Sequence, residues 1–188
     1  MDRCKVGVIG CGDISRVYLH SLTQVFRNTQ VVAVSSRGGE SARRRAAEFG
    51  IPYAVSTEEL LAMELDIVVI LTDPVSHFRL AGQALLAGKH TYVEKPLAAT
   101  TAEAAYLLTL AREKNLMLTC APDTLLGGGI QTCRKLIDNG LIGTPVASVG
   151  QTFNGGPESW HPNPFFLYQK GAGPLYDVGP YYIGGILY

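Results

Sequence analysis

Apolar residues in the first two thirds of the chain fall into short continuous runs, separated by stretches where they recur at helical spacing. The run from Ile67 to Leu71 is mostly β-branched, which is typical of a strand buried on both faces of a parallel sheet. Segment 14–25 instead places its apolar residues three and four positions apart, as an amphipathic helix does. Strands are therefore predicted at 5–9, 30–35, 53–55, 66–71, 90–93 and 116–121, and helices at 14–25, 40–49 and 102–114, with further helices beginning near Ser56 and Ser76.

Strands and helices alternate regularly as far as residue 121. This order predicts a doubly wound α/β fold, in which right-handed crossovers bring the carboxyl ends of the strands to one edge of a parallel sheet. Composition changes near Pro122, after which a helix is predicted at 130–139 and a strand at 146–153. We therefore predict a Rossmann domain at 1–122 and the start of an incomplete α/β domain at 123–188. The chain stops inside an apolar helix, so we expect it to be the front part of a longer protein.

Composition narrows the classes of function. The 188 residues carry 16 Lys and Arg against 16 Asp and Glu, and no basic stripe runs along the chain, which argues against a nucleic-acid partner. The apolar runs are far shorter than the roughly 20 residues of a spanning helix, so no membrane partner is expected. The N-terminus leads directly into a strand pattern, which predicts a cytoplasmic protein without a signal peptide. The four cysteines and four histidines lack metal-ligand spacing, so reduced thiols and no metal are expected.

A glycine turn joins the first strand to the first helix. Gly10 permits the turn, and Gly12 lets the backbone approach a pyrophosphate, although Ser15 replaces the third glycine of the usual fingerprint. At the end of the second strand, Ser36 and Arg37 stand where an NAD-binding fold often has an acid, and a guanidinium suits the 2′-phosphate of NADP. NADP is therefore favoured over NAD. Among the three arginines at 43–45, at most two can share a helical face and help to bind that phosphate.

Two charged residues follow the strand at 90–93, where a buried strand would simply end. In a parallel sheet, this edge faces bound ligands, so Lys95 is a candidate for chemistry. Pro96 confines the backbone of Lys95 to extended conformations and so stiffens this segment. The alternative is that Glu94 and Lys95 are ordinary surface charges entering a loop.

Three segments together resemble the glucose-fructose oxidoreductase, inositol dehydrogenase and rhizopine-catabolism (Gfo/Idh/MocA) family: Val8–Gly12, Ala87–Pro96 and Gly173–Tyr181. The resemblance implies a Rossmann domain followed by a domain with a mostly antiparallel sheet. It also implies hydride exchange between NAD(P) and a hydroxyl or carbonyl carbon of a sugar, cyclitol or related diol, in a homo-oligomer (a dimer or tetramer) when full length. The expected cofactor-binding residues are Gly10, Gly12, Asp13, Ile14, Ser36, Arg37, Thr72, Pro74, His77, Glu94 and Lys95.

The same resemblance assigns catalytic roles. Lys95 would lie beside nicotinamide and substrate, while Glu94 would steady Lys95 or contact the nicotinamide ribose. The family's Asp-x-Gly-x-His motif becomes Asp177 to Tyr181 here, with tyrosine in the histidine position, as in the branch containing glucose-fructose oxidoreductase and dihydrodiol dehydrogenases. Lys95 and Tyr181 are thus the predicted catalytic pair, and Asp177, with Lys95, the predicted substrate contact. A spacing of four would also put Asp177 and Tyr181 on one helical face.

Two other functions remain open from the sequence. One is a nucleotide-sensing regulator or scaffold that keeps the fold without chemistry, although such a protein would usually lose the lysine that Lys95 matches. The other is a redox-assisted glycosidase. Trp160 and His161 are candidates for lining the substrate pocket, or are simply packed within a long loop.

Overall fold

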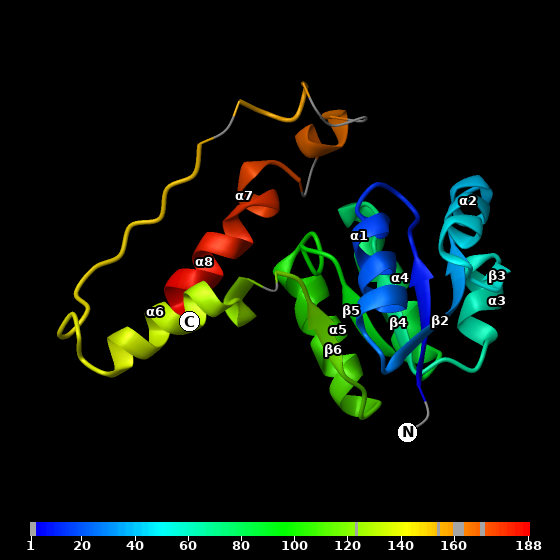
Figure 1. The fold of residues 1–188 in the computed structure, drawn as a ribbon, viewed down its shortest axis with the longest axis horizontal. Coiled ribbons are helices and arrows are strands. Elements are labelled where there is room, and N and C mark those ends of the chain that lie inside the picture. The colour runs from blue at the N-terminus through cyan, green and yellow to red at the C-terminus, as the bar shows by residue number, and fades with distance from the viewer. Residues whose placement is uncertain (1–2, 123, 154, 160–163, 170–171) are drawn as a thin grey trace. The chain divides into compact units, whose positions relative to one another are not determined.

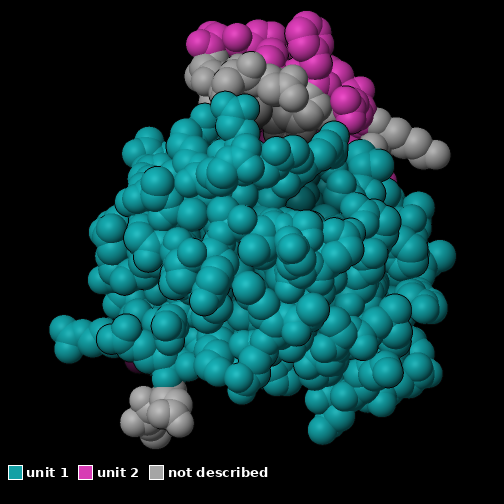
Figure 2. Space-filling view, turned by 90° about the vertical axis from the view of Figure 1, so that its right-hand side faces the viewer, with its two compact units in different colours: residues 1–120 teal, residues 121–188 magenta. Residues whose placement is uncertain are grey.

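The computed structural model describes the chain except for residues 1–2, 123, 154, 160–163 and 170–171. It divides into two compact units, residues 1–120 and 121–188 (Figure 2). Unit 1 holds the whole sheet, and unit 2 holds helices and extended segments. Each is described by itself.

Unit 1 is built on a six-stranded parallel sheet with the order β3-β2-β1-β4-β5-β6. The order reverses at β1, because the chain first moves outward to β2 and β3 and then returns to place β4 on the other side of β1. Such a reversal creates a crevice beyond the carboxyl ends of the two central strands, where ligands bind in this class of fold. The strands are β1 (Cys4–Ile9), β2 (Thr29–Ser35), β3 (Tyr53–Ala54), β4 (Ile67–Ile70), β5 (His90–Val93) and β6 (Leu118–Cys120).

Helices cover both faces of this sheet (Figure 1). On one face, Leu19 and Ala42 pack against strand residues such as Val8. On the other, Leu60, Leu85 and their neighbours form the second apolar core. The first face is covered by α1 (Ser15–His20) and α2 (Glu40–Phe49), and the second by α3 (Thr57–Ala62), α4 (Pro74–Leu86) and α5 (Thr101–Glu113). The predicted doubly wound Rossmann sheet is therefore confirmed.

Helix starts follow local capping chemistry, and some of them differ from the sequence prediction. Ser56 and Thr100 each form a capping box with the glutamate three residues on. Helix α4 begins at Pro74, two residues before the predicted start at Ser76, because proline is preorganised for the first helical position. Segment 14–25 is also not a uniform α-helix, since η1 (Ser21–Val25) continues α1 as a π-helix.

Unit 2 contains the helices predicted near residue 130 and at the C-terminal end, but two expectations about it are wrong. Residues 146–153 are extended and exposed rather than a strand, because the described part of unit 2 offers no neighbouring strand to pair with their backbone. The helical continuity expected between Asp177 and Tyr181 is broken at Val178. The helical segments are η2 (Thr124–Leu126), α6 (Gly128–Asp138), η3 (Pro164–Tyr168), α7 (Pro174–Asp177) and α8 (Gly179–Leu187).

Within the described residues, none of the helices has the length and apolar character needed to cross a membrane.

Candidate cofactor site

The glycine turn after β1 packs directly on the end of β4. Gly10 has φ of 104°, and a Cβ at this position would lie 2.6 Å from the carbonyl carbon and oxygen of Leu71. A side chain is therefore excluded by both the backbone conformation and the contact. Gly12 is different, because a Cβ there would meet nothing within 4 Å. Its exposed backbone is open to a ligand, which fits the role expected of a phosphate-binding turn.

Arg45 ties this turn to helix α2. Its Nη2 donates to the carbonyl oxygen of Gly12 at 3.1 Å, its Nε donates to Ser15 Oγ at 3.1 Å, and its Nη1 meets Glu48 at 2.7 Å. The Arg45 side chain is only 7% exposed, whereas Arg43 and Arg44 are exposed. Sequence reasoning treated the three arginines as phosphate ligands or solvated charges, and it missed this bracing role. The helical position of Arg45, three residues after buried Ala42, was the available signal.

A pocket of about 630 Å³ lies beside the turn. It brings together five of the predicted cofactor residues, including Ser36, Arg37 and Thr72 with the two turn glycines. Arg37 is 88% exposed and forms an ion pair with Asp73 at 3.1 Å, while Ser36 Oγ accepts a bond from the backbone N–H of Ala42. The guanidinium thus stands at the edge of the pocket, where the carboxylate of Asp73 holds it.

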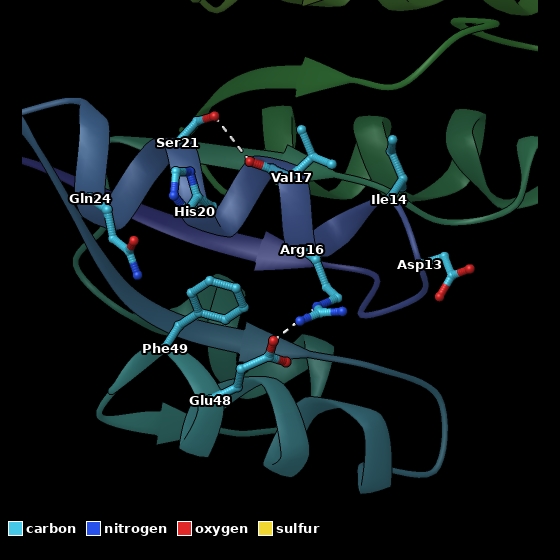
Figure 3. A pocket seen from close by; sticks show the side chains of 9 residues that line it. All are labelled: Asp13, Ile14, Arg16, Val17, His20, Ser21, Gln24, Glu48 and Phe49. Carbon is cyan, nitrogen blue, oxygen red and sulfur yellow. Dashed lines mark hydrogen bonds and ion pairs between the residues drawn. The ribbon is translucent and has the colours of Figure 1, made fainter.

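Asp13 and Ile14 lie at the start of α1 and line a second pocket of about 830 Å³ (Figure 3). This pocket follows the outer side of α1 and η1, and its remaining lining includes Glu48 and Phe49 of α2. Arg16 bridges it by donating to Glu48 at 2.9 Å. The predicted site residues that line this pocket, Asp13 and Ile14, do not line the pocket that contains Arg37.

The Lys95 segment leaves the sheet at the end of β5 and is partly buried. The Glu94 carboxylate accepts a bond from the backbone N–H of Lys95 at 2.8 Å and another from the Tyr18 hydroxyl at 2.7 Å. The Tyr18 and Tyr92 hydroxyls lie 3.2 Å apart. Burial, followed by these hydrogen bonds, holds the pKa of Tyr18 well above its ordinary value, so its hydroxyl stays protonated and keeps donating. Glu94 therefore steadies the backbone of Lys95.

His77 is fully buried on α4, close to the same segment. Its Nδ1 lies 2.6 Å from the carbonyl oxygen of Pro96, and its Nε2 lies 3.0 Å from that of Thr72. Both ring nitrogens thus face backbone carbonyl oxygens inside the fold, and one N–H of the ring can donate to one of them. Pro74 begins the same helix.

Asp177 and Tyr181 belong to unit 2 and are half-buried there, one at the end of α7 and the other in α8. Trp160 and His161 lie outside the described residues.

Among the residues that the structure describes, no group of three or more His, Cys, Asp or Glu side chains is arranged to hold a metal ion. The four cysteines are free thiols, and burial raises the pKa of Cys11 to about 11 and that of Cys120 to about 12.

A parallel sheet with a reversed strand order and a glycine turn of exposed backbone at the reversal is the architecture of a dinucleotide-binding α/β domain. Residues 4–121 match the model of the oxidoreductase family with an NAD-binding Rossmann fold, Gfo/Idh/MocA. The chain belongs to this family, as its motifs predicted.

Individual relatives agree with this assignment. The chain is 34% identical to a dTDP-3,4-didehydro-2,6-dideoxy-α-D-glucose 3-reductase of Saccharopolyspora spinosa, over 94% of the chain and 53% of the relative. It is 32% identical to an uncharacterized oxidoreductase of Schizosaccharomyces pombe, over 97% of the chain and 50% of that protein. The chain thus spans about half the length of the curated relatives it matches.

A solved structure carries the cofactor. The 3-ketoreductase KijD10 of Actinomadura kijaniata, in complex with NADP, is 34% identical and superposes with a TM-score of 0.70 over 76% of this chain and 46% of that chain. A putative myo-inositol dehydrogenase of Sinorhizobium meliloti shares the fold at 24% identity, with a TM-score of 0.69 over 74% of this chain and 42% of that chain.

Proposed function

We propose that the protein carrying this chain is an NAD(P)-dependent oxidoreductase that acts on a hydroxyl or carbonyl carbon of a sugar, cyclitol or related diol. The family and the names of the sugar reductases among its relatives support this reaction class. The single observation that carries the proposal is the position of Lys95, immediately beyond β5 at the ligand-facing edge of a sheet whose glycine turn is open to a dinucleotide.

The residues of this chain would divide the work between cofactor and substrate. The exposed backbone of Gly12 receives the pyrophosphate, while Ser36 and Arg37 recognise a 2′-phosphate, so NADP is the preferred cofactor. A bound nicotinamide supplies the site that accepts or donates the hydride. Lys95 stabilises the phenolate of Tyr181, a group with an ordinary pKa near 10, so that Tyr181 takes the proton from the substrate hydroxyl. Asp177 orients the substrate.

Replacement of Lys95 tests this proposal in the full-length protein. Lys95→Ala is expected to abolish turnover of a polyol or sugar panel, by about 100-fold or more, while NADP binding measured by titration stays within twofold of the unchanged protein. Lys89→Ala is a matched control, since this lysine donates to the carbonyl oxygen of Met63 at the end of α3 and precedes β5, away from the ligand-facing edge. Turnover that survives in Lys95→Ala would refute the assignment.

Product analysis separates the two other functions. An oxidoreductase forms NADPH in proportion to oxidised substrate, a redox-assisted glycosidase releases free sugar with the cofactor unchanged, and a nucleotide sensor does neither. The homo-oligomeric state of the full-length protein stays a prediction, and sedimentation checks it.

A further inference from the structure

Two side chains outside the predicted catalytic pair hold the backbone on either side of Lys95. Tyr18 reaches it from α1, which packs with the core on one face of the sheet. His77 reaches it from α4, which packs with the core on the opposite face. The Lys95 segment is therefore held from both layers of helices.

Tyr18 acts through Glu94. Its hydroxyl has one hydrogen, which is donated to Glu94 Oε1 at 2.7 Å, so the neighbouring Tyr92 hydroxyl at 3.2 Å is left to donate to the Tyr18 oxygen. The second carboxylate oxygen, Oε2, accepts the backbone N–H of Lys95 at 2.8 Å. Because both oxygens are engaged, the carboxylate cannot rotate without losing a charge-assisted bond, and the N-terminal side of Lys95 is fixed.

His77 acts on the C-terminal side. The imidazole lies between two carbonyl oxygens, those of Pro96 at 2.6 Å and Thr72 at 3.0 Å. Thr72 lies two residues beyond the end of β4, next to Leu71, against whose backbone the glycine turn packs. An imidazole in its neutral form has one N–H, so it donates to one of these carbonyl oxygens and packs against the other. The ring thus lies between the backbone that follows Lys95 and the backbone beside the glycine turn.

We propose that Tyr18 and His77 are positioning residues that hold the Lys95 ammonium group in its productive place. This inference rests on the proposed catalytic role of Lys95. Catalytic groups must be held to within about 0.5 Å of their working geometry, and a shift of about 1 Å costs about 100-fold in rate. His77 thus contributes from inside the fold, and it needs no contact with the cofactor of the kind first expected for it.

Kinetics of Tyr18→Phe in the full-length protein test the positioning role of Tyr18. The phenyl ring keeps its packing while Glu94 loses one donor, so kcat is expected to fall about tenfold or more, with the Kd for NADP within twofold and the thermal midpoint almost unchanged. Tyr53→Phe is the matched control, because Tyr53 is exposed on the edge strand β3. A wild-type kcat in Tyr18→Phe would overturn the proposal, as would an equal loss in the control.

His77 is tested by a conservative pair. His77→Asn retains one N–H donor near the Nδ1 position and is expected to keep several-fold more turnover than His77→Leu, which has none. Equal turnover in the two variants, measured with NADP saturating, would contradict the role. If Tyr18→Phe fails to fold, this pair of His77 variants still tests whether a side chain outside the catalytic pair positions Lys95.

A double variant tests whether Tyr18 acts through the lysine. If Tyr18 works through Lys95, then Tyr18→Phe causes no further loss of rate in a Lys95→Ala background, whereas additive losses would overturn the link. The two levels of inference also fail separately. Turnover surviving in Lys95→Ala refutes the proposed function, and a Lys95→Ala protein that is dead beside a fully active Tyr18→Phe protein refutes only the positioning role.

Discussion

Lys95 and Arg37 are the two cationic groups proposed to serve the cofactor edge, and the chain holds them in opposite ways. The backbone around Lys95 is engaged by a glutamate that Tyr18 and an N–H hold in place, and by a histidine with no exposure to solvent. Arg37 is 88% exposed and is held by an ion pair with Asp73, itself 41% exposed. One group is held by the packed fold and the other by solvent-screened charge.

This difference follows from what each group would have to do. Exposed ion pairs contribute only about 0–1 kcal/mol, so Arg37 can exchange Asp73 for a phosphate at little cost. A group that assists proton transfer loses rate when it moves, so it benefits from partners that cannot rearrange. Selectivity for the cofactor is therefore expected to be easy to alter, whereas catalysis is expected to tolerate few changes.

The largest expected effect comes from a change in the glycine turn after β1, which lies at the same sheet edge as Lys95 and Arg37. Gly10→Ala would force a Cβ to within 2.6 Å of the Leu71 carbonyl group and would put alanine at φ of 104°. We expect a loss of about 3 kcal/mol or more in the free energy of unfolding, from the overpacking and backbone strain combined. Urea denaturation measures it. Gly12→Ala is the control, because a Cβ at Gly12 would meet nothing within 4 Å. This variant should keep the free energy of unfolding while its affinity for NADP falls. Equal stability of the two variants would show that the turn does not rest on β4.

Removal of Arg45 is expected to have the next largest effect. Arg45→Ala leaves the hydroxyl oxygen of Ser15 without its buried donor and removes one of the two donors to the carbonyl oxygen of Gly12, which still accepts from Ser15 Oγ. The free energy of unfolding should fall by about 2 kcal/mol, and NADP affinity should fall with it, since the turn loses its brace. Arg44→Ala, which removes an exposed neighbour on the same helix, should leave both nearly unchanged. If the two variants behave alike in denaturation and titration, the bracing role is wrong.

Arg37→Ala tests the exposed group in this comparison, the guanidinium proposed to bind the 2′-phosphate. Loss of a charge-assisted hydrogen bond to the 2′-phosphate should lower the affinity for NADP by about tenfold. NAD has no 2′-phosphate, so its affinity should change by less than about twofold, and stability should not change because the ion pair is exposed. Calorimetric titrations with the two cofactors side by side provide the measurement. Equal losses for NAD and NADP would remove the case for phosphate recognition.

The smallest effect is expected for Asp73→Asn. This change releases Arg37 from its present partner while keeping the shape of the side chain and its contact with Ser76 Oγ. NADP affinity should rise by about two- to threefold at low salt, and the gain should shrink as salt screens the charges. Weaker NADP binding would mean that Asp73 helps Arg37 to reach the phosphate, so the pair would then be part of the site.

Much of unit 1 could be predicted because its signals are local. The glycine at the end of α2, the capping pair of Ser56 and Glu59, and the β-branched run of β4 each act through near neighbours in the sequence. Alternation of such elements restricts the topology to very few choices, so the ligand-facing edge could be predicted too. The segment at 146–153 was mispredicted because its composition suits a strand, whereas a strand forms only where another strand accepts its hydrogen bonds.

The sequence by itself determined the alternation of strands and helices, the glycine turn after the first strand and the position of Lys95 at the sheet edge, because hydrophobic period, glycine and proline act over a few residues. Only the tertiary structure decided that Arg45, Tyr18 and His77 converge on that edge. These three come from three different helices, and the distances between helices depend on how the two apolar cores pack. Packing brings together side chains far apart in the chain, and no local pattern records their contact.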